Sequence, residues 1–313
     1  MKHFIQALSC AAFAALFFSA CNTNAPTCCC CGGGTEEPVV LRGEFSVSEN
    51  HKVRFAPGNL YFTGETWRFY DEQFLYYGYG STVSGVTSPR DLFMFGQTGY
   101  IPTTMSQDGA NHSDLEKISQ HGGYNKHTSK REDIDGTNWD WGIRFGIENG
   151  GNQPGMWRTL SKDEWKYLLE DRPNAERLKM PAMVAGRRGY LLLPDNYSHP
   201  NGVVYPDFEG SYTADQNIYC YEDWKKMEAG GAIFLPCAGV KDANYETFYP
   251  ERCGYYWTTT VAGEKDINNF AVQFGFKKGE TADKNITTPQ PITLLGDVPA
   301  YWRCAVRLAQ EVR

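Results

Sequence analysis

Short segments rich in aromatic and β-branched residues recur along this chain, and they constrain its fold more than any other feature. Gly, Asn, Asp and Pro bound these segments, which is typical of strands separated by turns. Several alternate, as residues 270–274 (FAVQF) do, and alternation indicates a strand with one face in water. The predicted strands include 53–55, 60–62, 67–69, 190–193, 232–235, 255–257, 270–276 and 304–308.

Two segments carry helical signals instead. The first begins with a capping box, because the side chains of Ser161 and Glu164 can each accept a hydrogen bond from the other residue's backbone N–H. Pro173 ends this helix, and a second helix is predicted over 221–229, before Gly230-Gly231. Few helices among many short strands predict an α+β or mostly β domain. The residues expected on the buried helix faces are Trp165, Leu168, Leu169, Trp224 and Met227.

The amino-terminal segment has the pattern of a bacterial lipoprotein signal. Lys2 precedes an apolar run from Phe4 to Phe18, and the small residues 19–20 precede Cys21. The run is shorter than the roughly 20 apolar residues that a membrane-spanning helix needs. Because the segment resembles a lipobox, we expect removal of residues 1–20 and acylation of Cys21. An ordinary signal peptide with an incidental Cys21 is the alternative.

Residues 21–40 are polar and Gly-rich, so we expect a flexible, lipid-anchored linker. It contains four consecutive cysteines, Cys28, Cys29, Cys30 and Cys31, whose role the sequence leaves open. Residues 41–313 contain no further linker and are long enough for a single domain. The formal net charge of −7 and the absence of a basic stripe argue against nucleic acid as a partner.

Five ordered motifs in residues 41–313 resemble a large family of envelope lipoproteins, known in Bacteroidota and fibrobacters as a major paralogous domain. They are GGNQPGMWRTLSKDEW (150–165), LLLPD (191–195), GAIFLPCAG (231–239), GYYWT (254–258) and AVRL (305–308). The opening segment 45–60 and Trp67-Arg68-Phe69 also resemble this family. The resemblance covers nearly the whole chain after residue 41.

Such domains are similar to the formylglycine-generating enzyme and to the C-type lectin-like fold. The resemblance implies small antiparallel sheets, two short helices, long loops and neighbouring termini. We expect the long polar segments 101–136 and 277–299 to be loops of this scaffold. The tryptophans inside the motifs are expected in the core, namely Trp157, Trp165, Trp224 and Trp257.

The cysteines of the domain bear on catalysis and on disulfides. Residues 301–307 resemble the terminal Arg-Cys-Ala-x-Arg segment of formylglycine-generating enzymes, but 294–299 lack the second reactive Cys of those enzymes. We therefore expect no catalysis by Cys304. An exported domain with four cysteines suits two disulfides, and Cys237 with Cys304 is the pairing we favour, although all four could stay reduced. The candidates are Cys220, Cys237, Cys253 and Cys304.

An oxygen-rich segment is the favoured candidate metal site, and the histidines of the same loop are a second one. Asp133, Asp135, Asn138 and Asp140 offer the ligands that calcium prefers, although an Asx-turn explains the same residues. The nearby histidines, His112, His121 and His127, are expected to lie in a solvated loop. No cofactor other than calcium is expected.

The surplus of aromatic residues favours a ligand-binding function. Tyr and Trp rings stack on the apolar faces of sugars, and the same residues anchor protein interfaces, while each of them also suits core packing. We therefore predict an outer-membrane lipoprotein, facing the periplasm or the cell surface, whose non-catalytic domain binds a glycan or a protein ligand. The alternatives are an adhesin or assembly component that binds another envelope protein, and a divergent formylglycine-generating-enzyme-like enzyme. The candidate ligand-binding residues are Asn244, Tyr245, Phe248, Tyr249, Tyr255, Asn268, Tyr301 and Trp302.

Overall fold

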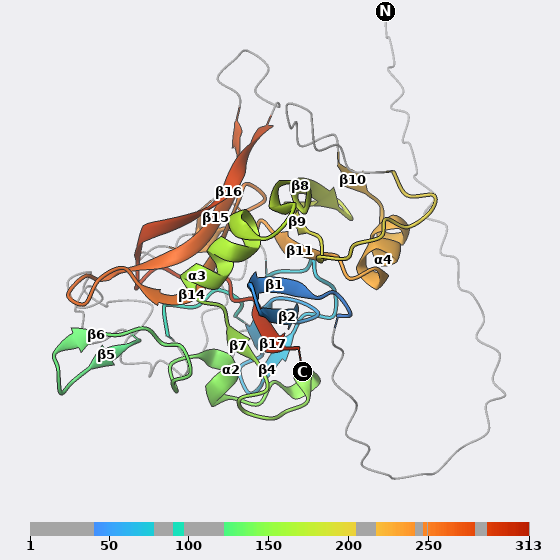
Figure 1. Ribbon diagram of the computed structural model, residues 1–313. Helices are drawn as coiled ribbons and strands as arrows, with labels where there is room; N and C mark the ends of the chain where they lie inside the picture. The colour runs from blue at the N-terminus through green and yellow to red at the C-terminus, as the bar shows by residue number, and fades with distance from the viewer. Residues whose placement is uncertain are drawn as a thin grey trace, which may run out of the picture. The chain divides into compact units, whose positions relative to one another are not determined.

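The computed structural model describes residues 41–77, 90–96, 122–204, 217–241, 247–248, 250–278 and 287–312. Small antiparallel sheets and few helices make up the domain, so the α+β prediction is confirmed (Figure 1). The predicted signal segment, Cys21 and the cysteines 28–31 lie outside the described residues. Within the described part of the chain, no helix is long and apolar enough to cross a membrane.

The two ends of the domain meet in one four-stranded sheet. Its order is β1-β2-β17-β7, and all neighbours are antiparallel. Because β17 lies between β2 and β7, the first and last strands of the domain stabilise each other. The strands are β1 (Phe45–Ser48), β2 (His51–Phe55), β7 (Arg158–Thr159) and β17 (Leu308–Glu311).

The second four-stranded sheet has the order β10-β8-β9-β11, in which only β10 and β8 are parallel. Helix α4 (Tyr221–Ala229) directly follows β10, and its buried Trp224 and Met227 pack in the same hydrophobic cluster as strand residues such as Phe234. The predicted second helix and its buried face are therefore confirmed. The strands are β8 (Lys179–Val184), β9 (Arg187–Leu192), β10 (Ile218–Tyr219) and β11 (Ile233–Pro236).

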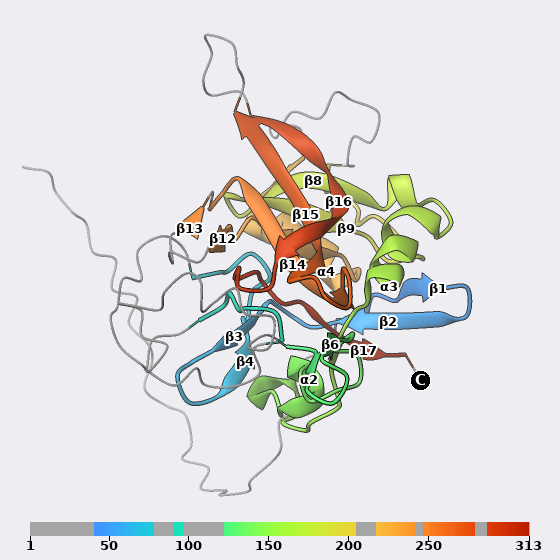
Figure 2. The same cartoon turned by 90° about the vertical axis from the view of Figure 1, so that its left-hand side faces the viewer.

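The long strands β14 (Cys253–Val261), β15 (Asn268–Lys278) and β16 (Thr287–Pro299) form the third sheet (Figure 2). The prediction that 277–299 is a loop is therefore wrong for its described part, because β15 and β16 pair as a long hairpin. The prediction of one wet face is also wrong. Val272 and Phe274 lie in one hydrophobic cluster and Ala271 in another, so this central strand is covered on both faces.

Helix α3 (Lys162–Lys166) begins at the predicted capping box. Ser161 Oγ accepts the backbone N–H of Glu164 at 3.2 Å, and the Ser161 N–H donates to the Glu164 carboxylate at 2.8 Å. The helix continues as a π-helical turn, η3 (Tyr167–Asp171), and ends at Arg172, immediately before Pro173. Trp165, Leu168 and Leu169 are buried, as predicted.

The remaining elements are short. The predicted 101–136 loop contains the hairpin β5–β6 in its described part, while 101–121 lie outside the described residues. The predicted strand 304–308 is interrupted, because Cys304 and Ala305 form only isolated bridges before β17 begins. The short elements are β3 (Leu60–Phe62), β4 (Trp67–Phe69), β5 (Tyr124–Asn125), β6 (Lys130–Arg131), α2 (Trp141–Arg144), η2 (Glu148–Gly150), η4 (Ala175–Arg177), β12 (Val240–Lys241) and β13 (Thr247–Phe248).

Arg307 is a buried cation at the centre of a polar network in the core. Arg307 is 1% exposed, donates to the side-chain oxygens of Gln73 and Asn59, and burial lowers its pKa to about 10. Asn59 donates in turn to the Tyr256 hydroxyl at 3.0 Å, which donates to a carbonyl of β11. These bonds join distant segments of the chain. The four tryptophans predicted in the core, Trp157, Trp165, Trp224 and Trp257, are all buried.

Candidate functional site

Three predicted ligand-binding residues converge on one part of the surface. Strand β12 pairs with β13 on one side, and on the other Lys241 exchanges two backbone hydrogen bonds with Arg303, of 3.1 and 2.8 Å. Ala305 bridges to Tyr256 of β14, so residues 301–305 lie against both β12 and β14. The turn that carries Tyr301 and Trp302 is thereby fixed beside β14, an edge strand of the third sheet.

Tyr255 and Trp302 form an aromatic pair. Their ring centroids are 6.2 Å apart and the ring planes meet at 73°. Both side chains are half-buried and pack against the hydrophobic cluster that contains Trp257 and Cys304. Because each ring retains exposed area, part of the pair is available to a ligand. Tyr301 is also half-buried.

The other candidates divide into two groups. Asn268 is half-buried at the start of β15, opposite Pro299 and therefore near the turn that leads to Tyr301. The backbone of Phe248 lies in β13, paired with Val240. Asn244, Tyr245 and Tyr249 lie outside the described residues.

A cluster of charged residues adjoins the aromatic pair. Arg90, Lys241 and Arg303 are half-buried, and the charges of Arg303 and Arg90 join burial in lowering the pKa of Lys241, while Asp91 opposes them. We call Arg90, Asp91, Lys241, Tyr255, Tyr301, Trp302 and Arg303 the Trp302 surface. The four charged members of the Trp302 surface were not predicted from the sequence. Two of them lie close to predicted features, because Lys241 follows the 231–239 motif and Arg303 follows Trp302.

Asp91 is the buried member of the Trp302 surface. It accepts the Tyr77 backbone N–H at 2.5 Å and the Tyr70 hydroxyl at 3.2 Å. Burial raises the pKa of Asp91, and these two hydrogen bonds and the Lys241 charge oppose that rise. Tyr70 also stacks on Tyr61 with a centroid distance of 4.5 Å, so a second aromatic pair is linked to the charged cluster.

The four cysteines of the domain are free thiols in the structure, so the Cys237–Cys304 disulfide is not formed there. Cys220 is exposed, whereas Cys237, Cys253 and Cys304 are buried. Burial raises the pKa of these three thiols, most strongly for Cys237 and Cys304. A buried, protonated Cys304 lacks the access and ionisation that a nucleophile needs.

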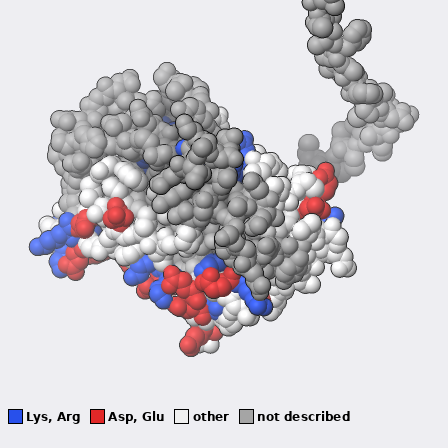
Figure 3. All heavy atoms as spheres, turned by 90° about the horizontal axis from the view of Figure 1, so that it is seen from above, with Lys and Arg blue, Asp and Glu red and all other residues white. Residues whose placement is uncertain are grey.

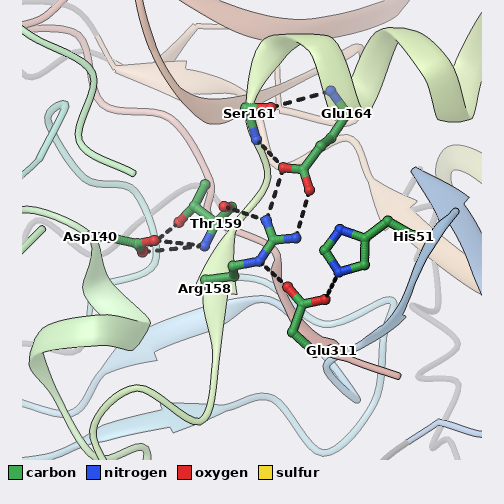
Figure 4. A network of polar contacts seen from close by, with 7 residues as sticks. All are labelled: His51, Asp140, Arg158, Thr159, Ser161, Glu164 and Glu311. Atoms are coloured by element: carbon green, nitrogen blue, oxygen red, sulfur yellow. Dashed lines mark hydrogen bonds and ion pairs between the residues drawn. The ribbon is translucent and has the colours of Figure 1, made fainter. Parts of the chain in front are cut away.

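Two residues of the predicted calcium segment, Asp133 and Asp140, accept hydrogen bonds from different partners, and Figure 4 shows those of Asp140. Asp140 is buried at the N-cap of α2 and accepts hydrogen bonds from the Thr159 backbone and hydroxyl and from the Gly142 N–H, which is the Asx-type alternative. Asp133 accepts the Val261 N–H, and Asp135 and Asn138 are exposed. Across the described residues, no three His, Cys, Asp or Glu side chains gather as metal ligands. Calcium binding stays a prediction.

The histidines of the same region have no common site in the described structure. His127 is exposed in the turn between β5 and β6, and its backbone N–H donates to Asn125. His112 and His121 lie outside the described residues.

Arg158 organises a network of ion pairs beside Asp140 (Figure 4). Its guanidinium binds both oxygens of Glu164, at 2.9 and 2.6 Å, and also binds Glu311, which pairs with His51. Burial alone would raise the pKa of Glu164, but the hydrogen bonds and charge of Arg158 outweigh it and lower the pKa. The network thus ties β7, α3 and β17 together.

A polar cavity of about 600 Å³ adjoins this network through Glu311. The described residues of its lining include no aromatic side chain on which a sugar could stack. We therefore take the Trp302 surface as the candidate site. The cavity is lined by Arg54, Gln153, Pro154, Gly155, Met156, Gln310 and Glu311.

Figure 3 shows Lys and Arg side chains beside Asp and Glu side chains among the described residues of one face. Comparison of the chain with protein-family models, curated proteins and solved structures finds no match.

Proposed function

We propose that this protein is a lipid-anchored envelope protein of C-type lectin-like fold that binds a glycan at the Trp302 surface. The observation that carries the proposal is the half-exposed Tyr255–Trp302 pair, held beside basic side chains. Aromatic rings bury the apolar faces of sugars, and adjacent polar groups satisfy the hydroxyls.

The geometry supports a preformed site. The backbone around Trp302 is held at two points. The Trp302 backbone N–H donates to the Pro299 carbonyl at 2.9 Å, and the next residue, Arg303, pairs with Lys241. The Trp302 ring itself packs against Tyr255 and the hydrophobic cluster around Trp257, so it should lose less side-chain freedom when a ligand binds than a fully exposed ring would. The buried Cys304 thiol, one residue further on, supports binding over catalysis at this segment.

The lectin-like part of the proposal rests on the arrangement of elements. Small antiparallel sheets, two main helices and a sheet that joins the two ends of the domain are compatible with what the family resemblance implies, whereas the long β15–β16 hairpin is an addition to it. Ligand sites in such scaffolds are expected on loops and turns, and the turn that carries Trp302 fits this expectation.

The test is binding of the full chain to a glycan array, followed by titration calorimetry with the glycan that binds. We expect Trp302→Ala to weaken binding about fivefold or more, because loss of one stacking aromatic residue removes about 1 to 3 kcal/mol. The matched control is Trp139→Ala, since Trp139 is 40% exposed and lies outside the Trp302 surface. Equal losses in both variants, or no saturable glycan, would refute the proposed site and favour a protein partner.

The lipid anchor has a test of its own. Cells that express the chain and are fed labelled palmitate should label the protein at Cys21, and Cys21→Ser should abolish the label and release the protein from membranes. Membrane attachment that survives Cys21→Ser would contradict the anchor, whatever the domain binds.

A further inference from the structure

We infer that the polar cavity beside the Arg158 network binds a short, uncharged peptide segment. The described lining of this cavity shares no residue with the Trp302 surface, so it is a second site whose ligand is independent of glycan binding. Its volume of about 600 Å³ falls within the roughly 300 to 1,000 Å³ of typical ligand sites. Its lining combines fixed walls, free amide groups, paired charges and a small apolar patch.

The first wall of the cavity belongs to the sheet that joins the two ends of the domain. Arg54 of β2 and Gln310 of β17 are direct cross-strand partners in this sheet. Residues opposite each other in an antiparallel pair project their side chains from the same face. The pairing therefore places the guanidinium and the carboxamide side by side, and Glu311 follows at the end of β17.

The second wall is a tight turn formed by residues 153–156 (QPGM). The Met156 N–H donates to the Gln153 carbonyl at 3.3 Å, which closes the turn. Gly155 has φ +79° and follows a proline, and these two features are typical of a type II turn. The Gly155 N–H donates to the Gly142 carbonyl at 2.8 Å, so the turn is also bonded to α2. Both walls are thus in place before a ligand binds.

The side-chain amides of Gln153 and Gln310 are the available hydrogen-bonding groups of the lining. Neither amide has a hydrogen-bond partner among the described residues. Gln153 is exposed and Gln310 is half-buried, so a ligand in the cavity can reach both. Each carboxamide offers two donors and an acceptor. Together they suit a ligand group that both donates and accepts, as a peptide amide does.

Both charged residues of the described lining already have ion-pair partners. Arg54 donates to the Glu44 carboxylate at 2.6 Å, and Glu311 binds Arg158 and His51. A charged ligand would compete with these partners and would also lose its own hydration on entering the cavity. A ligand without net charge avoids both costs. The cavity therefore favours a neutral ligand that is rich in hydrogen-bonding groups.

The remaining lining favours a peptide over a sugar. Pro154 and Met156 supply a small apolar patch, and the described residues of the lining include no aromatic ring for a sugar to stack on. A methionine side chain is unbranched and flexible, so it adapts to aliphatic groups of different shape. A peptide segment meets both needs, because its backbone amides match the glutamines and a small aliphatic side chain matches Met156.

The experiment follows the Met156 methyl group by NMR in the full chain, produced with isotope-labelled methionine methyl groups. Met156 lines the cavity, whereas Met180 and Met227 are buried in the cluster around Trp224, so their signals are internal controls. Met156→Leu identifies the Met156 signal. The peptide probes are the capped tripeptide N-acetyl-Ala-Asn-Ala-amide and its two charged analogues, with Asp or Lys in place of Asn. Maltotriose is the neutral sugar probe of similar size.

We expect the neutral peptide to shift the Met156 signal saturably and to leave the two control signals unchanged. Gln153→Ala and Gln310→Ala should each weaken this binding about threefold or more, and the double variant about tenfold, because each removes a hydrogen bond to the ligand. Gln273→Ala is the matched control, since Gln273 lies in β15 and does not line the cavity, and it should change the affinity less than about twofold. Thermal unfolding establishes that each variant is folded, and Gln153→Ala on the exposed turn serves if Gln310→Ala fails to fold.

Several outcomes would overturn this inference. They are no Met156 shift with the neutral peptide, an equal loss in Gln273→Ala, and tighter binding of a charged analogue than of the neutral peptide. A saturable shift with maltotriose alone would replace the peptide by a neutral sugar. Peptide binding that weakens in Trp302→Ala would place the peptide at the Trp302 surface. Peptide binding that survives Trp302→Ala supports the cavity, whether or not that variant loses a glycan.

Discussion

Replacing Asp140 by Asn should make the stability of the domain less dependent on pH. Asp140 is fully buried, and burial raises its pKa to about 7 against the opposing effect of three donors, the Thr159 N–H and hydroxyl and the Gly142 N–H. An unfolded aspartate has a pKa of about 3.9. Between these two values the folded state therefore binds more protons than the unfolded state.

The sign and size of the effect follow from proton linkage. Because the folded state holds the extra proton, the unfolding free energy that Asp140 contributes is complete below pH 4 and is lost as the pH rises through 7. With the two pKa values above, the loss between pH 5 and pH 8 is about 2 to 3 kcal/mol. An Asn side chain does not titrate, so the Asp140→Asn variant should lack this loss.

Urea unfolding at pH 5, 6, 7 and 8 measures the effect. The difference between wild-type and Asp140→Asn unfolding free energies should change by about 2 to 3 kcal/mol in favour of the variant as the pH rises from 5 to 8. Subtraction removes the contributions of groups present in both proteins. Asp163→Asn is the control, because the Asp163 carboxylate is 84% exposed. Parallel wild-type and Asp140→Asn curves would refute the reasoning.

Three further predictions concern stability and thiol chemistry. Ser161→Ala should lower the unfolding free energy by about 1 kcal/mol, measured by urea unfolding, because it removes half of the capping box of α3. Arg307→Ala should lower the unfolding free energy by about 3 kcal/mol or more, because it leaves the buried side chains of Gln73 and Asn59 without their cation. The control is Lys126→Ala at an exposed position, which should lower the unfolding free energy by less than about 0.5 kcal/mol. Alkylation followed by peptide mass spectrometry should modify Cys220 in the folded protein and Cys304 only after unfolding; protection of Cys220 would contradict its exposure.

Local signals in the sequence predicted the helices well. The capping box at Ser161 and the Gly230-Gly231 pair specify helix ends through contacts a few residues apart, and the structure has both. The long strand β16 escaped prediction because its sequence, rich in Thr and Pro with few large apolar side chains, lacks the usual strand composition. Its strand conformation comes from pairing with β15, which is a tertiary effect.

The candidate site, like β16, depends on contacts between segments that are far apart in the sequence. Tyr255, Tyr301 and Trp302 could be proposed from the sequence because an aromatic side chain is a candidate for ligand stacking wherever it lies. Lys241 and Arg303 are 62 positions apart, and only the pairing of β12 with the 303–305 segment makes them neighbours. A charged cluster built from such separated segments leaves no periodic signal in a single sequence.

Residues 301–308 change from half-buried to buried along the segment that resembles an enzyme motif. Tyr301, Trp302 and Arg303 are half-buried, whereas every residue from Cys304 to Leu308 is buried. The Arg-Cys-Ala-x-Arg pattern extends from 303 to 307, so most of its residues face the core: Cys304 packs in a hydrophobic cluster and Arg307 holds the polar network around Gln73. The residues from Cys304 to Leu308 therefore pack in the core, whereas Tyr301, Trp302 and Arg303 keep exposed area. Substitutions at Trp302 and Arg303 should accordingly change ligand binding at little cost in stability, while substitutions at Cys304 and Arg307 should do the reverse.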